Sequence, residues 1–183
     1  VWTLQNHPRV PGKIRASHAQ WGLAKDEFQD NGNWPYNIYV REARRMKSSL
    51  VMTEAHCKNK ILVKEPVGMG AYTLDSHNTQ RFVHNGMIMN EGDIQTHIGG
   101  KPYGISYRSI VPEEQECENL LVPWALSATH IAFGSIRMEP VFMVLGQSSG
   151  TAACLAIDAK SSVQAIPYNT LRTRLLKDDQ RLP

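Results

Sequence analysis

The chain has 183 residues, of which 42% are hydrophobic and 20% are charged, and this composition excludes an intrinsically disordered chain. Its length suits one domain with a sizeable core or a part of a larger protein. The net charge of +3 is mild, and the sequence lacks the basic stripe with interleaved aromatic residues that favours nucleic acid. No nucleic-acid partner is therefore expected.

The first third of the chain predicts loops followed by short regular elements. Residues up to about 34 are punctuated by proline and glycine, and Trp2, Trp21 and Trp34 are expected to fill the core there. The segment "YNIYVREARRM" spaces its apolar residues as a helix does, with its basic residues on a solvated or interdomain face. "SLVMT" predicts a short strand, and "TEAHC" predicts a single helical turn.

The remainder predicts a β-rich part and a helical end. Short β-like pieces separated by glycines over residues 61–97 predict a small, mostly antiparallel sheet. "ENLLVPWAL" predicts a buried strand because its apolar run is continuous, and "SATHIAFGSIR" predicts a loop. A long helix is expected over residues 139–159, with Pro140 in its first turn. A terminal amphipathic helix follows, its apolar face formed by Leu171, Leu175 and Leu176.

These elements predict an α/β protein, more narrowly an α+β fragment. We expect N-terminal loops and an interdomain helix over residues 1–60. A β-rich substrate-binding part is expected over residues 61–112, and a strand, loop and helix that close a second domain over residues 113–183. The opening "VWTLQNHPRVPGKIR" is typical of a mature or cut fragment, so the compartment stays open.

Cysteine and histidine patterns predict neither disulfides nor a metal site. The three cysteines are widely separated and form no CxxC pair, and the seven histidines show no metal-ligand spacing. The longest apolar run, residues 141–157, is interrupted by polar and glycine positions at its centre, so a membrane span is not expected.

Gly146 and Gly150 lie four residues apart within this apolar helix. On one helix face they would form a bare stripe that lets another backbone approach closely. The helix N-terminus carries free N–H groups and a partial positive charge, so it would stabilise an anion placed against it.

Several segments resemble one family. "YVREARRM", "YTLDSHNTQR", "PYGISYRSIVP", "NLLVP" and, most specifically, "GSIRMEPVFMVLGQSSGTAA" are similar to the C-terminal half of bacterial FAD-dependent oxidoreductases. Some members of the nearest group carry the label xanthan lyase. The resemblance covers the chain from about Trp34 to its C-terminus.

The resemblance implies a set of flavin-facing residues. The long helix would point its N-terminus at the flavin pyrimidine edge, where Arg137 would add a positive charge. The two glycines would seat the helix against the dinucleotide-binding sheet. The cofactor-binding residues expected for FAD are Ser127, Arg137, Glu139, Pro140, Gly146, Gln147 and Gly150.

The resemblance also implies catalytic candidates: His130, His77 and Arg108. His130 would face the flavin ring together with Thr129, and a hydrogen-bonded structural histidine is the alternative. Arg108 would approach the ring from the crossing between domains, although either it or Arg137 could instead pair with Glu113 or Glu139. Asp75, His77 and Arg81 would contact substrate.

Two departures limit the resemblance. Pro123 and Trp124 stand where many flavoproteins have Gly-Asp or Gly-Arg, and the sequence has no GxGxxG turn for the FAD diphosphate. We therefore expect the C-terminal portion of an FAD-dependent oxidoreductase that transfers hydride between flavin and a small polar, carbohydrate-related substrate. It would be incomplete without an N-terminal dinucleotide-binding segment.

Other readings remain open. An exposed apolar face where the absent sheet docks would favour homo-oligomers. A carbohydrate-binding or interaction module would use Trp2, Trp21, Trp34 and Trp124 as stacking surfaces. A polysaccharide lyase would need a positioned base and a carboxylate-neutralising group, for which His77 and Arg81 are candidates.

Overall fold

The structure is a computed structural model that describes residues 1–40 and 42–183. Its internal contacts divide the chain into two units, Val1–Arg41 and Glu42–Pro183. The boundaries expected at residues 60 and 112 stay a prediction.

The first unit contains short helices where loops were predicted. They are α1 (Trp2–Asn6), α2 (Gly12–His18) and the 3₁₀ helix η1 (Gln29–Asn31), and none of them contains a buried residue. Trp2, Trp21 and Trp34 are 66%, 74% and 55% exposed. The expectation that they fill a core is therefore wrong for the described residues, because this unit has too little chain to enclose them.

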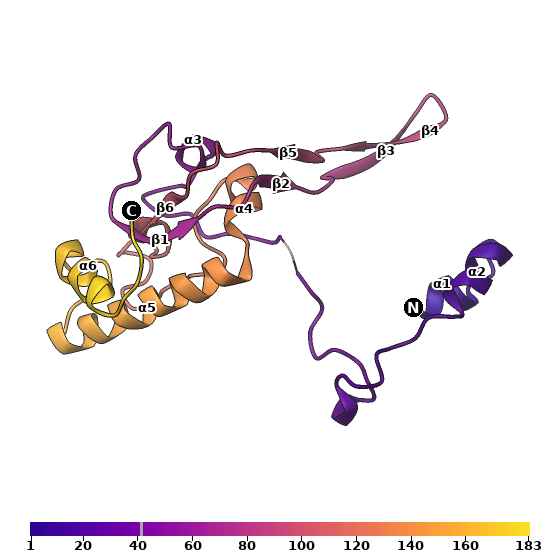
Figure 1. Ribbon diagram of the computed structural model, residues 1–183, viewed down its shortest axis with the longest axis horizontal. Helices are drawn as coiled ribbons and strands as arrows, with labels where there is room; N and C mark the ends of the chain where they lie inside the picture. The colour runs from indigo at the N-terminus through magenta and orange to yellow at the C-terminus, as the bar shows by residue number, and fades with distance from the viewer. Residues whose placement is uncertain (41) are drawn as a thin grey trace. The chain divides into compact units, whose positions relative to one another are not determined.

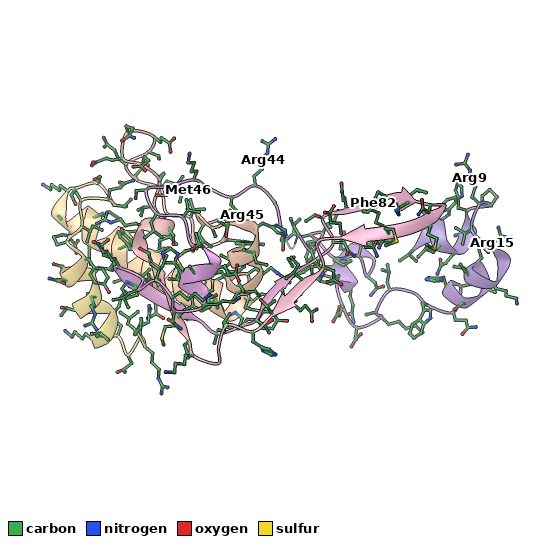
Figure 2. The ribbon with its side chains drawn as sticks, turned by 90° about the horizontal axis from the view of Figure 1, so that it is seen from above. Arg9, Arg15, Arg44, Arg45, Met46 and Phe82 are labelled. Carbon is green, nitrogen blue, oxygen red and sulfur yellow. The ribbon has the colours of Figure 1, made fainter. Side chains whose placement is uncertain are left out.

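The helix predicted around residues 36–46 is also wrong, although Arg41 lies outside the described residues. Ile38 is 88% exposed, so the periodic apolar positions find no surface to cover. An isolated helix of this length is marginal in water. Figure 2 shows Arg44 directed outward, whereas Arg45 lies 5.1 Å from the centre of the Phe133 ring and donates to the carbonyl of Ala128.

The predicted antiparallel strands form three two-stranded sheets in place of one. The pairs are β1 (Pro66–Gly70) with β6 (Tyr103–Ser106), β2 (Leu74–Ser76) with β5 (Ile94–Thr96), and β3 (Gln80–His84) with β4 (Met87–Glu91). Asn85 and Gly86 close the last pair with φ of 50° and 73°, as a type I′ turn requires. This hairpin extends away from α4 and β2 (Figure 1).

Four helices belong to the second unit: α3 (Glu54–Cys57), α4 (His130–Ile136), α5 (Glu139–Ala159) and α6 (Tyr168–Lys177); the 3₁₀ helix η2 (Tyr107–Ser109) follows β6. The predictions of α3, α5 and α6 are confirmed. The loop predicted before Arg137 is wrong because Thr129 caps α4, its Oγ1 accepting from the N–H of Ala132 at 3.4 Å.

The strand predicted in "ENLLVPWAL" is also wrong. Val122 donates to the carbonyl of Ile110, but Pro123 has no N–H to continue a ladder, and Leu120 is 45% exposed. The segment therefore runs outside any strand of the described chain.

The core lies between α4, α5, α6 and the sheet of β1 and β6. Burial raises the pKa of the Cys57 thiol to about 11 and that of Tyr107 to about 12, so both side chains stay uncharged in the fold. Tyr107 also donates to the carbonyl of Val163 at 2.7 Å. These polar groups are therefore part of the core packing.

Helix α5 has two different faces. Val141, Leu145 and Ala152 are buried, whereas Met143 and Ile157 are 73% and 74% exposed. Among the described residues, α5 is long and apolar enough by length and composition to cross a membrane. Core helices of soluble proteins share that property, so it is weak evidence, and the absence of a membrane partner stays a prediction.

Candidate functional site

Arg137, the residue that follows α4, is the centre of a polar cluster in the second unit. Its side chain is 3% exposed. One terminal nitrogen, Nη2, lies 3.2 Å from both Oδ2 and the backbone carbonyl of Asp75 and donates to Nε2 of His77 at 3.4 Å. Its Nε lies 3.9 Å from Oε1 of Glu42, which is within ion-pair range and too long for a hydrogen bond.

The same glutamate also contacts His130. Its Oε2 lies 3.0 Å from Nδ1 of His130. An ionised carboxylate only accepts hydrogen bonds, so this contact favours the imidazole tautomer with its proton on Nδ1. We call Glu42, Asp75, His77, His130 and Arg137 the carboxylate–imidazole cluster.

The packing of α4 on β2 holds this cluster together. Asp75 is the middle residue of β2, while His130 and Arg137 lie at the two ends of α4. Gly134 brings the helix so close that a Cβ there would lie 2.5 Å from the carbonyl oxygen of Asp75. Because glycine has no side chain at this position, α4 can approach β2 closely enough for Arg137 to form an ion pair with Asp75.

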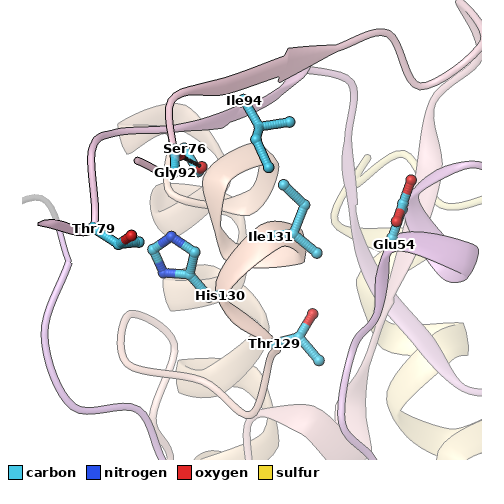
Figure 3. A pocket seen from close by; sticks show the side chains of 8 residues that line it. All are labelled: Glu54, Ser76, Thr79, Gly92, Ile94, Thr129, His130 and Ile131. Carbon is cyan, nitrogen blue, oxygen red and sulfur yellow. Dashed lines mark hydrogen bonds between the residues drawn. The ribbon is translucent and has the colours of Figure 1, made fainter. Parts of the chain in front are cut away.

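A pocket of about 440 Å³ adjoins the cluster, within the size range of small-molecule sites. Figure 3 shows the His130 ring beside Thr79, with Ile94 and Ile131 along the neighbouring wall and Glu54 across from them. The complete lining is Glu54, Ser76, Thr79, Gly92, Ile94, Thr129, His130 and Ile131. Apolar walls with a few polar groups are typical of ligand sites.

Arg108, a predicted catalytic residue, has its contacts elsewhere. Its Nε lies 2.6 Å from Oε2 of Glu65, and its Nη1 donates to the carbonyl of Gln164 at 2.9 Å. The guanidinium carbon also lies 5.6 Å from the centre of the Tyr107 ring. Arg108 therefore pairs with Glu65, and Arg137 pairs with Asp75.

The predicted flavin-facing residues lie on and before α5. Ser127 is buried, and its Oγ accepts from the N–H of Ser48 at 3.1 Å. Glu139 and Pro140 are exposed at the start of α5, which has no side-chain cap. A Cβ at Gly146 or Gly150 would meet nothing within 4 Å, so the glycine stripe faces open space.

These features test whether the described residues fit FAD. An uncapped, exposed helix start and an open stripe beside it suit the flavin end of the cofactor. The diphosphate has no counterpart, because the sequence contains no GxGxxG turn. The described residues therefore fit one end of FAD.

Sequence reasoning identified His130, His77, Asp75 and Arg137 but missed Glu42. Glu42 lies within the basic run "VREARR", in a segment that was predicted to be a helix. Only its position as the one carboxylate in that run sets it apart. An imidazole held by a carboxylate beside a pocket is the arrangement of a general acid or base.

Comparison with protein families gives one finding. Residues 2–175 match the family described as FAD dependent oxidoreductase. Neither the curated proteins nor the solved structures yielded a match. Because the family match covers more than half of the chain, the chain belongs to the FAD-dependent oxidoreductase family.

Proposed function

We propose that this chain is the C-terminal portion of an FAD-dependent oxidoreductase that acts on a small polar, carbohydrate-related substrate. The observation that carries the proposal is the His130–Glu42 pair at the edge of the pocket, at 3.0 Å, in a chain of this family. His130 holds or releases the substrate proton at Nε2, and Glu42 fixes the ring. FAD, when bound, supplies the acceptor or donor of a hydride.

The start of α5, with Glu139 and Pro140, together with Ser127 and Arg137, would form the flavin end of the cofactor site. Its partial positive charge favours negative charge on the pyrimidine edge. The guanidinium of Arg137 already faces two carboxylates, which neutralise its charge. Arg137 would therefore hold the cluster in place beside the flavin and supply little net positive charge to it.

We further propose that a dinucleotide-binding segment docks on the glycine stripe of α5. Gly150 and its exposed neighbours Gln147 and Met143 leave one side of the helix uncovered in the described chain. Small residues at such positions allow close backbone approach, as the third glycine of dinucleotide folds does between helix and strand.

Gly146→Leu separates docking from folding. The side chain meets open space in this chain, so we expect its thermal unfolding to stay unchanged or to rise slightly, since leucine favours helix over glycine by about 0.5–1 kcal/mol. In a version extended upstream to a GxGxxG segment, we expect FAD affinity to fall at least about tenfold, followed by flavin absorbance and fluorescence.

The matched control is Asp158→Leu, an exposed position near the other end of α5, which should leave FAD affinity intact. If neither the chain nor its extended version binds FAD, the proposed function fails. If the extended version binds FAD and Gly146→Leu does not weaken it, the stripe is not the docking surface.

We propose that the chain alone self-associates through the β3–β4 hairpin. Both strands are exposed along their whole length, and Phe82, labelled on the hairpin in Figure 2, is 41% exposed. Val83 and Ile88 reach 73% and 76%. An isolated two-stranded hairpin is only marginally stable in water, so the hairpin should pair with that of a second copy. Light scattering should then show a mass above that of the monomer, and Ile88→Lys should reduce it. A monomer at all concentrations would contradict this proposal.

Exposed tryptophans favour a second candidate, a carbohydrate-binding module. Trp2, Trp21, Trp34 and Trp124 are all more than half exposed, as stacking surfaces for sugars must be. Oligosaccharide binding without flavin, detected by tryptophan fluorescence and lost on Trp21→Ala, would support this candidate. Absence of such binding would reject it.

A further inference from the structure

Four polar atoms of the carboxylate–imidazole cluster have no hydrogen-bond partner among the described residues. They are Oε1 of Glu42, Oδ1 of Asp75, Nε2 of His130 and Nε of Arg137, and each exposes less than 1 Å². Buried polar groups in folded proteins are nearly always hydrogen-bonded. Of these four residues His130 lines the pocket, so its Nε2 points to a molecule in the pocket that bonds it.

The chemical character of these atoms restricts that molecule. The two carboxylate oxygens accept, and Nε of Arg137 donates. Nε2 of His130 accepts when Nδ1 carries the proton toward Glu42. A hydroxyl group both donates and accepts, so it can satisfy either kind of atom.

The charge of the cluster restricts it further. Glu42 and Asp75 face one guanidinium, that of Arg137, which leaves an excess of one negative charge when the imidazoles are neutral. Glu54 lies on the pocket wall, and its carboxylate is paired with Lys58 at 2.5 Å. This lysine therefore does not offset the excess negative charge of the cluster. A carboxylate or phosphate ligand would therefore meet repulsion here.

We infer that the pocket takes a small, neutral, hydroxyl-bearing molecule whose hydroxyl hydrogen-bonds to Nε2 of His130, with Glu42 as the positioning residue of that imidazole. This inference rests on the proposed function, since it names the substrate class of the same site. Ser76, which follows Asp75 on β2, and His130, the first residue of α4, both line the pocket.

Access to Nε2 requires a small movement of the pocket wall. Thr79 is exposed and lies beside the His130 ring (Figure 3). Its Oγ1 donates to the carbonyl of Glu91 at 3.2 Å. Rotation of this one side chain therefore gives up one exposed hydrogen bond.

The test uses this chain labelled with ¹⁵N and needs no flavin. Imidazole spectra report which ring nitrogen of His130 carries the proton, and two probes of similar size are titrated: D-glucose, which is neutral, and D-glucuronate, which is anionic. We expect D-glucose to shift the Nε2 signal of His130 saturably. D-glucuronate should bind at least about tenfold more weakly because of the excess negative charge.

Two variants separate positioning from pocket shape. Glu42→Leu should abolish the fixed Nδ1–H tautomer and weaken D-glucose binding at least about fivefold, because leucine has no acceptor for Nδ1–H, whereas Glu42→Asp should restore part of both. Glu116→Leu makes the same chemical change at an exposed position outside the pocket lining; it is the matched control and should change neither.

The inference is overturned if neither sugar shifts His130, if D-glucuronate binds as tightly as D-glucose, or if Glu42→Leu leaves the tautomer in place. An unshifted His130 would mean that water alone satisfies the four atoms. None of these outcomes depends on FAD, so the titration of the extended chain with FAD can succeed while this inference fails.

Discussion

Arg137→Met is expected to lower the free energy of unfolding by about 3–5 kcal/mol, because it leaves buried carboxylates without their cation. Arg137 is 3% exposed, and the side chains of its partners Asp75 and Glu42 are only 13% and 18% exposed. Methionine fills a similar volume, so the loss measures charge and hydrogen bonding more than packing. Thermal and urea unfolding followed by circular dichroism would measure it.

The control for this prediction is Arg108→Met. The Arg108–Glu65 pair is shorter, at 2.6 Å, but its side chains are 31% and 30% exposed, so water screens the interaction and we expect a loss of about 1 kcal/mol. If Arg108→Met lowered the free energy of unfolding more than Arg137→Met does, burial would not be the factor that sets the strength of these ion pairs.

A second variant tests the pairing itself. Adding Asp75→Asn to Arg137→Met removes one of the unpaired charges, so the double variant should regain part of the lost stability. The expected coupling between the two sites is about 0.5–3 kcal/mol. Additive losses would show that Arg137 and Asp75 do not interact.

The helices predicted correctly from sequence carry their own local signals. Helix α5 begins with Glu139 and Pro140 and keeps an apolar spacing for 21 residues. The terminal helix α6 buries Leu171 and Leu175 on the predicted face, although Leu176 is 41% exposed. Where composition, first-turn residues and apolar spacing agree within one segment, the sequence was sufficient to predict the helix.

The elements that were missed depend on partners distant in sequence or on weak propensities. Helix α4 contains Gly134 and Ser135, which are poor helix formers, and it forms because it packs on β2 and has Thr129 as its cap. The helix predicted around Ile38 fails for the opposite reason, since its apolar residues have no surface to cover.

The residues of the site also divide into those with a signal in their own segment and those that depend on a contact between distant segments. His130, His77 and Arg137 could be predicted because they lie in segments that resemble a family. Glu42 could not, because its role comes from a contact with His130, 88 positions along the chain, that only the folded backbone creates. Ion pairs between segments leave no periodic pattern in a sequence.

Gly134→Ala is expected to destabilise the fold by about 1–3 kcal/mol, although alanine is normally the better helix residue by about 1 kcal/mol. A Cβ at Gly134 would lie 2.5 Å from the carbonyl oxygen and 2.9 Å from the carbonyl carbon of Asp75. Backbone atoms cannot turn aside as a flexible side chain can, so α4 and β2 must separate. For a chain of this length the melting temperature should fall by roughly 2–12 °C.

Gly146→Ala is the matched control, since it makes the same chemical change on α5 where a Cβ meets nothing within 4 Å. It should raise stability by about 0.5–1 kcal/mol. The two variants should therefore change the free energy of unfolding in opposite directions. Equal changes would contradict the close contact between α4 and β2. Because that contact places Asp75 against Arg137, Gly134→Ala should also weaken the Asp75–Arg137 ion pair, so that adding Arg137→Met to Gly134→Ala costs less stability than it does in the unaltered chain.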